Sequence, residues 1–253
     1  MMALTVSPAV LLLFLRAMGV LSSAPVFSSG LVPFPARVGL AAALSFATAG
    51  YLPPETSSNL ILLGILSLKE LVIGLAIGYV AQLPLYAAQV AGSLIDLESG
   101  ISAAQLISPG QGQAISLIGT VFVWLALALF VVIGGLRWLV ADLLLGLKVV
   151  PLGSQVVFGG ITQMLVQMTA GVLTSGLLLS LPAFVTVVLL NLLLGVIGRA
   201  APQINPLSLG LGAGPILAVA VTALTLPIIG ILLANLLQAS LQNLPAVFRL
   251  LGP

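Results

Sequence analysis

The sequence predicts an all-α, polytopic integral membrane protein, and three observations lead to this class. First, the chain of 253 residues is 60% hydrophobic and only 5% charged, whereas soluble domains are about 45–50% apolar and about 25% charged. Second, its apolar runs are long and rich in Leu and Gly. Third, these runs lack the alternation of apolar and polar residues that is typical of a transmembrane barrel. Because so few charges cannot cover a water-facing surface, lipid or other apolar subunits must cover much of this one.

Length and absent residue types narrow the class further. The length allows roughly six or seven helical spans of about 20 residues each, so we expect one membrane domain over residues 1–253 and no separate soluble domain. The chain has no Cys and no His, which excludes disulfides, a His-ligated metal and a His base. No basic patch suggests nucleic-acid binding. We therefore expect neither a metal nor a cofactor.

Pro, Gly and polar residues divide the chain into apolar segments. Arg16 lies inside the first run and no basic residue precedes it, so this run is interpreted as a retained helix and not as a signal peptide. The expected breaks lie at Pro53-Pro54, the polar loop 93–113, Gly134-Gly135, Pro182 and the Gly-rich turn 210–215. The expected helices cover residues 8–27, 37–52, 60–92, 114–135, 136–150, 157–179, 182–199 and 216–238, followed by a mildly amphipathic tail at 239–253.

The third run is predicted to be a long, tilted or kinked helix. As one helix, residues 60–92 would be on the order of 48 Å long, which exceeds the roughly 30 Å hydrocarbon core of a membrane. The run must therefore tilt, kink at Pro84 or protrude from the bilayer.

A seam for helix packing is expected on one face of this helix. Glu70, Gly74 and Gly78 are spaced four apart, and the same face continues roughly to Gly92. Glycines at this spacing let a second helix approach closely. Glu70 should therefore point into the seam, either as a buried carboxylate held by hydrogen bonds or by a neighbouring Arg or Lys, or as an ion or proton site.

The other carboxylates give no pattern for catalysis. Asp96 and Glu98, two residues apart, would not face each other on a helix, and we interpret them as the solvated end of the long helix. An intramembrane aspartyl hydrolase would have to use Asp96 and Asp142, with no supporting glycine motif. Nothing here resembles a nucleophile with its base, so we expect no enzyme activity.

The basic residues suggest helix ends and contacts. Arg16 could reach a carboxylate or a backbone carbonyl, or could extend to the membrane interface. Arg137, Asp142 and Lys148 form a small charged group, in which Lys148 marks a membrane edge. Arg199 ends an apolar run as a cationic helix end.

The residues after Arg199 predict a turn or a subunit contact. Pro202 disfavours continuation of the helix, Gln203 follows it, and Asn205 can cap the next element.

Four segments, in order along nearly the whole chain, resemble the FliR family of flagellar biosynthesis proteins, the membrane export-gate family shared with type III secretion systems. The last of them is the most specific. They are Arg16–Gly19 with Ala24–Ser28, Lys69–Gly78, Gln89–Gly92 with Leu94–Asp96, and Asn191–Gly195 running into Arg199–Asn205.

The resemblance implies a core subunit of the flagellar export gate in the bacterial inner membrane. Its expected partners are the P-type, Q-type, B-type and A-type membrane subunits (FliP, FliQ, FlhB and FlhA), the lipid bilayer and the unfolded flagellar proteins that pass through the pore.

The resemblance also implies a pore plug within residues 97–113. The residues of the plug are Gly100, Ser108, Pro109, Gly110 and Gln111. A Gly-rich segment would have the flexibility that a moving plug needs.

The alternative is a secondary transporter for a small solute or ion. Broken helices with Pro and Gly and isolated buried charges fit that class. We find no internal repeat in the sequence, which a transporter would be expected to show.

Overall fold

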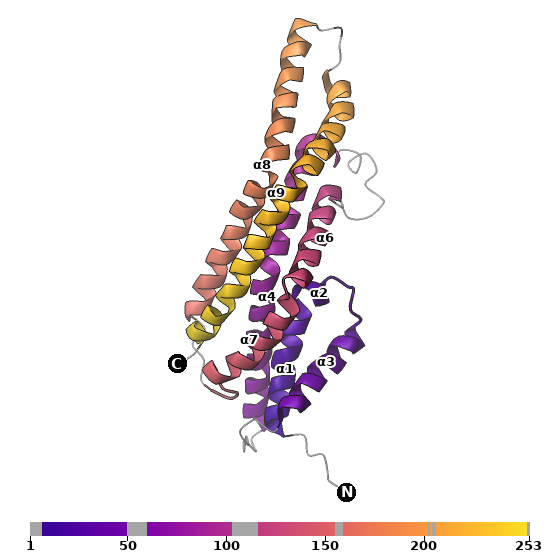
Figure 1. The fold of residues 1–253 in the computed structure, drawn as a ribbon. Helices are drawn as coiled ribbons and strands as arrows, with labels where there is room; N and C mark the ends of the chain where they lie inside the picture. Colours follow the sequence, from indigo (N-terminus) through magenta and orange to yellow (C-terminus); the bar gives the residue numbers. More distant parts are fainter. Residues whose placement is uncertain are drawn as a thin grey trace. The chain divides into compact units, whose positions relative to one another are not determined.

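The computed structural model describes residues 7–49, 60–102, 116–154, 159–201, 203 and 206–251, and Figure 1 draws them coloured from the N-terminus to the C-terminus. Within these ranges every regular element is a helix, as the composition predicts. The helices are α1 (Pro8–Ser23), α2 (Pro25–Ser28), α3 (Phe34–Thr48), α4 (Leu60–Ser99), α6 (Leu117–Val132), α7 (Gly135–Val149), α8 (Gly159–Ala200) and α9 (Pro206–Leu251).

Several apolar runs that the sequence separates are joined into longer helices. The break expected at Pro182 is wrong, because α8 continues through this residue. The Gly-rich turn expected at 210–215 is also wrong, because this segment and the tail up to Leu251 belong to α9. Proline removes only one backbone donor, and a helix among other helices can tolerate that loss. The polar segment from 93 to 99 likewise belongs to α4.

Among the described residues, three helices are long and apolar enough to cross a membrane, and the count rises to four spans if α6 and α7 form one broken span. This is fewer than the six or seven that the length allows, because α1 and α3 are too short to count as spans and α8 unites two runs expected to be separate. The break between α6 and α7 is confirmed at Gly134, where φ is 79° and the two helices bend by 63°. That backbone conformation favours glycine over residues with a Cβ.

The chain divides into two compact units, whose boundaries lie within α4, α6, α8 and α9. Unit 1 comprises Met1–Leu83, Phe130–Met168 and Gln238–Pro253. Here α1 packs against α3, and one end of α1 buries Ala9, Leu12 and Leu13 in a cluster with Leu152. The C-terminal part of α9 contacts α7, where the ring of Phe248 occupies the space that a side chain at Gly146 would need.

Unit 2 comprises Pro84–Leu129 and Thr169–Leu237. The C-terminal half of α4 touches α6 where Gly92 meets Gly119, and it touches α8 where Gly176 meets Val90. The end of α4 contacts α9 at Gly214, where an added methyl group would collide with the carbonyl oxygen of Ser99. Small residues therefore mark each of these three close contacts.

Large apolar side chains remain exposed on both units. Leu60 and Ile61 of α4 are 82% and 77% exposed, and Leu224 of α9 is 81% exposed. Within each of the three long apolar helices, only 22% of the most apolar window is buried. Lipid or other subunits must cover these faces, as the composition implies.

Candidate functional site

A seam of glycines brings α1 and α4 into backbone contact within unit 1. A Cβ at Gly74 would collide with the carbonyl oxygen of Arg16, and a Cβ at Gly78 would collide with Ser23 and the Val20 carbonyl. From the opposite side, a Cβ at Gly19 would meet the carbonyl oxygen of Leu71 at 2.5 Å. The two backbones can approach this closely only because these positions carry no side chain.

A buried ion pair joins the same two helices one turn away from Gly74. Arg16 of α1 and Glu70 of α4 are both fully buried. The Arg16 Nε donates a hydrogen bond of 2.6 Å to Oε2 of Glu70, and the Nη2 lies 2.6 Å from the same oxygen. The Nη1 donates to the carbonyl oxygen of Val150 at 3.0 Å. Arg16 therefore links α1 both to α4 and to the end of α7.

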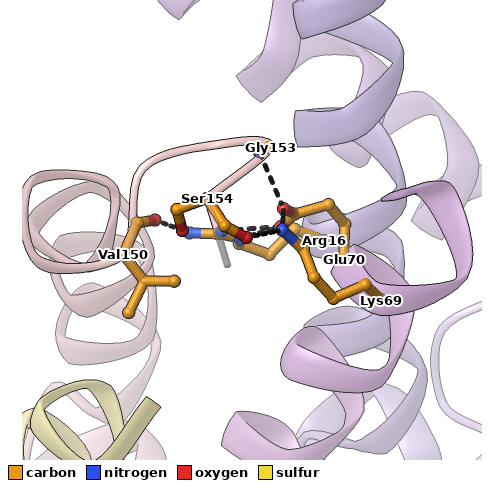
Figure 2. A network of polar contacts seen from close by, with 6 residues as sticks. All are labelled: Arg16, Lys69, Glu70, Val150, Gly153 and Ser154. Carbon is orange, nitrogen blue, oxygen red and sulfur yellow. Dashed lines mark hydrogen bonds and ion pairs between the residues drawn. The ribbon is translucent and has the colours of Figure 1, made fainter. Parts of the chain in front are cut away.

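The second oxygen of Glu70 is occupied as well (Figure 2). Its Oε1 lies 3.3 Å from the Nζ of Lys69 and accepts a hydrogen bond of 3.4 Å from the backbone N–H of Gly153. The Lys69 Nζ also donates to the carbonyl oxygen of Ser154 at 2.6 Å. As Figure 2 shows, these side chains of α1 and α4 meet the backbone that follows α7.

This cluster, which we call the Arg16–Glu70 network, is suited to holding segments together. It contains two cations and one carboxylate, and Lys69 is 11% exposed at its edge. Burial of a charge is tolerated when the charge is paired and its remaining donors and acceptors are satisfied, and both oxygens of Glu70 are engaged. The geometry is that of a structural ion pair, which ties α1 and α4 to the turn at 150–154.

A second buried carboxylate lies in unit 2 and caps a helix. The Oδ2 of Asp96 accepts a hydrogen bond of 2.7 Å from the Ser116 hydroxyl, and both carboxylate oxygens accept from the N–H of Ile118, at 3.2 and 3.3 Å. The Ser116 hydroxyl accepts in turn from the N–H of Gly119 at 2.9 Å. The first N–H groups of α6 thus find acceptors, and a negative charge lies at the positive end of the helix.

The interpretation of Asp96 as a solvated helix end is therefore wrong. Asp96 is fully buried because the α4 face that carries it packs against the start of α6. Glu98 is half-buried, and its carboxylate accepts a hydrogen bond of 2.9 Å from the side-chain amide of Asn191 in α8. The two carboxylates lie on different faces and have different partners, so they form no acid–base pair.

We expect Asp96→Ala to destabilise unit 2 by about 1–3 kcal/mol, because buried donors of Ser116 and Ile118 lose their acceptor. Asp96→Asn keeps one acceptor oxygen and should cost less. Ser93→Ala is the matched control, since the Ser93 hydroxyl donates only to the Gln89 carbonyl of its own helix. Thermal unfolding in detergent would measure the difference. Equal losses for Asp96→Ala and Ser93→Ala would contradict the capping role.

The remaining residues expected in the seam, the plug and the turn have separate surroundings wherever the structure describes them. Gly92 lies in unit 2, where it contacts Gly119 of α6. Gly100 ends α4 with φ of 80°. Arg199 and Gln203 are exposed. Ser108, Pro109, Gly110, Gln111, Pro202 and Asn205 lie outside the described residues.

The charged group around α7 is not a cluster of ion pairs. Asp142 is 3% exposed, and its Oδ2 has no hydrogen-bond partner among the described residues. Arg137 and Lys148 are both exposed. Within the described part of the chain, Arg16 and Lys69 are the only cations that form ion pairs.

Several members of the two sites could not be found by sequence reasoning. Val150, Gly153 and Ser154 contribute backbone atoms, which leave no mark in the side-chain pattern. Ser116 is a recognisable helix cap, since it precedes the apolar run of α6, but its partner Asp96 lies 20 residues earlier in the chain.

Comparison with known proteins gives matches over most of the chain. The model of the family described as bacterial export proteins, family 1, matches residues 7–240. The flagellar biosynthetic protein FliR of Escherichia coli K12 is 28% identical over 216 residues, covering 85% of this chain and 83% of that protein. FliR of Aquifex aeolicus is 29% identical and covers 90% and 89%. The surface presentation of antigens protein SpaR of Shigella flexneri is 29% identical over 154 residues, covering 61% and 59%.

Proposed function

The chain belongs to family 1 of the bacterial export proteins, and from this premise we propose that it is a membrane subunit of the flagellar type III export apparatus. The family match over residues 7–240 and the similarity to relatives named as flagellar biosynthetic proteins carry the proposal. The three long apolar helices support a place in the bacterial inner membrane as a multi-pass protein.

The distribution of polar and apolar groups supports a subunit that packs against other membrane helices. The buried charges Arg16, Glu70 and Asp96 hold helices to one another. The exposed apolar faces of α4, α8 and α9 leave room for further membrane helices. We propose that the P-type, Q-type, B-type and A-type export subunits (FliP, FliQ, FlhB and FlhA) cover part of these faces, and that lipid covers the rest.

We also propose that the chain acts as part of a conduit and not as an enzyme. Asp96 is one of the two carboxylates that an aspartyl hydrolase would need, and its oxygens already serve as the cap of α6. Passage of an unfolded chain through a pore requires an opening and no covalent chemistry.

Deletion of the gene from its own bacterium tests the proposal. We expect the flagellar filament protein to disappear from the culture medium and to remain in the cell, because the export pore is incomplete. A plasmid copy of the gene should restore secretion, and a copy carrying Ser93→Ala should do so equally well. Normal secretion by the deletion strain would contradict the proposal.

The pore plug at residues 97–113 stays a prediction, and we propose a narrower test of it. Residues 97–102 carry Glu98 and the end of α4, and Ser116 caps α6. Residues 103–113 lie outside the described residues and can be replaced without touching these contacts.

We expect replacement of residues 103–113 by a short Gly-Ser linker to raise leakage of ions across the inner membrane, because the closed pore loses its obstruction. Ion-dependent growth inhibition and dye uptake would measure the leakage. Exchange of residues 155–158 by a linker of the same length is the control. Unchanged leakage in a variant that still enters the complex would contradict the plug.

A further inference from the structure

Two adjoining cavities lie on one side of α7 within unit 1. The larger has a volume of about 440 Å³ and is lined by Ile133, Gly134, Arg137, Trp138 and Ala141. The smaller has a volume of about 130 Å³ and shares Ile133 and Trp138 with the first. Its other lining residues come from α9: Gln238, Leu241 and Gln242.

The cation at these cavities, Arg137, pairs with no carboxylate that the structure describes. Arg137 is exposed, and none of the ion pairs in the described part of the chain includes it. Asp142 is five residues further along α7, about 140° around the helix from Arg137, and it is buried. A guanidinium without an ion-pair partner among the described residues, in a chain with 12 charged residues in all, marks a place where an external anion would be stabilised.

We propose that Arg137, Trp138, Gln238 and Gln242 bind the phosphate headgroup of an anionic phospholipid. Guanidinium donors match phosphate oxygens in geometry and charge, and the amides of the two Gln residues can donate further hydrogen bonds without adding charge. Trp prefers the headgroup level of a membrane. Basic pockets between membrane helices are typical sites for anionic lipid headgroups.

The surface next to the cavities suits the acyl chains of such a lipid. Leu145 follows Ala141 by one helical turn on the same side of α7 and is 55% exposed. Val132, next to the lining residue Ile133, is 80% exposed. The headgroup would therefore bind at the polar cavity while its chains cover apolar side chains. This inference depends on placement in a membrane and not on the export role.

The chain offers a spectroscopic probe for this site, because it has two Trp residues. The variant Trp124→Phe leaves Trp138 as the sole source of indole fluorescence. The full-length variant would be reconstituted in vesicles of zwitterionic lipid that contain increasing amounts of phosphatidylglycerol or phosphatidylcholine, each brominated near the headgroup. We expect phosphatidylglycerol to quench Trp138 with a preference of about fivefold, the size expected for one arginine beside an anionic lipid.

Two variants in this background test the assignment. Arg137→Gln should abolish the preference, whereas Arg249→Gln should keep it, because Arg249 is also exposed but lies outside both cavities. In the protein with Arg137 intact, raised salt should weaken the preference, a result that does not depend on the folding of any variant at this position. Quenching by brominated phosphatidylcholine should be the same in all variants.

Equal quenching by both lipids with Arg137 intact would overturn the proposal, as would a preference that survives Arg137→Gln. A different occupant of the cavities would be an acidic segment of a partner subunit. To test for it, the same quenching measurement would be repeated on the complex with the neighbouring export subunits. Retained preference supports the lipid site. Loss of the preference there would assign the cavity to an acidic segment of a partner subunit and would also overturn the proposal.

Discussion

Glu70→Gln is expected to destabilise the protein by about 3–5 kcal/mol, the loss typical of a buried ion pair that keeps only one side. The substitution preserves size but removes the one negative charge of the Arg16–Glu70 network. Arg16 and Lys69 would then be two neighbouring cations whose partners are all neutral, namely the amide oxygen of the new side chain and the backbone carbonyls of Val150 and Ser154. Equilibrium unfolding in mixed detergent micelles would measure the free energy.

Arg16→Gln is expected to cost less than Glu70→Gln. Without Arg16, the cluster keeps the contact between Lys69 and Glu70, whose opposite charges cancel. Arg16→Gln still costs stability, because the Val150 carbonyl loses its hydrogen bond from the guanidinium. If Glu70→Gln lowers the free energy of unfolding more than Arg16→Gln does, the net charge left in the cluster determines the cost. Burial alone would not produce this order.

Glu98→Gln is the control for both substitutions. Glu98 lies on the same helix and is half-buried, but its carboxylate has one neutral partner, Asn191. Its replacement should cost about 1 kcal/mol or less. Two results would contradict the stabilising role of the Arg16–Glu70 network. One is an equal loss of stability for Glu70→Gln and Glu98→Gln, and the other is a loss for Arg16→Gln that exceeds both.

Gly74→Ala is expected to have the second large effect, a loss of about 1–3 kcal/mol or more from overpacking. The added methyl group would collide with the carbonyl oxygen of Arg16, which belongs to the backbone of α1 and cannot turn aside like the tip of a side chain. Helix α1 would have to move away, and the guanidinium of Arg16 would move with it, away from Glu70.

Gly64→Ala provides a matched control on the same helix. A Cβ at Gly64 would meet nothing within 4 Å, and alanine favours a helix over glycine by about 1 kcal/mol. We expect a neutral or stabilising change there. The same unfolding measurement applies, and equal effects of Gly64→Ala and Gly74→Ala would show that α1 and α4 are not in backbone contact.

The two effects should not add. Both Gly74→Ala and Glu70→Gln loosen the contact between α1 and α4, so the double variant should lose less than the sum of the single losses. Glu70→Gln combined with Gly64→Ala should be additive, because Gly64 takes no part in that contact.

The helical class and several helix boundaries could be predicted from the sequence, because they depend on local properties. The sparse charge and the long apolar runs predict membrane helices. Gly134-Gly135 predicts the bend that the structure has between α6 and α7. The spacing of Glu70, Gly74 and Gly78 placed them on one face, since helical geometry fixes which residues share a face.

Partners across the fold could not be predicted. Arg16 and Glu70 are 54 residues apart, and Gly153 lies 83 residues after Glu70, so only the packing of α1, α4 and the turn after α7 brings them together. The capping role of Asp96 could not be predicted for the same reason. Asp96 caps α6, which begins about 20 residues later in the chain and meets Asp96 only through packing of the two helices.

Local signals also overstated the breaks in α8 and α9. Pro182 and the glycines of 210–215 are typical of turns, but tertiary contacts decide the outcome. Gly214 lies within α9 at a close contact with the Ser99 carbonyl, so the absent side chain serves helix packing there and not a turn.

The most direct test of the central claim is the native mass of the complex that contains this chain. The tagged chain would be expressed with the neighbouring membrane genes of its own bacterium and purified in mild detergent. We expect it in a large assembly with several smaller membrane subunits, as an export subunit requires. A lone chain or a homo-oligomer, although those subunits are present in the same membrane, would contradict the claim and would favour a transporter that is complete by itself.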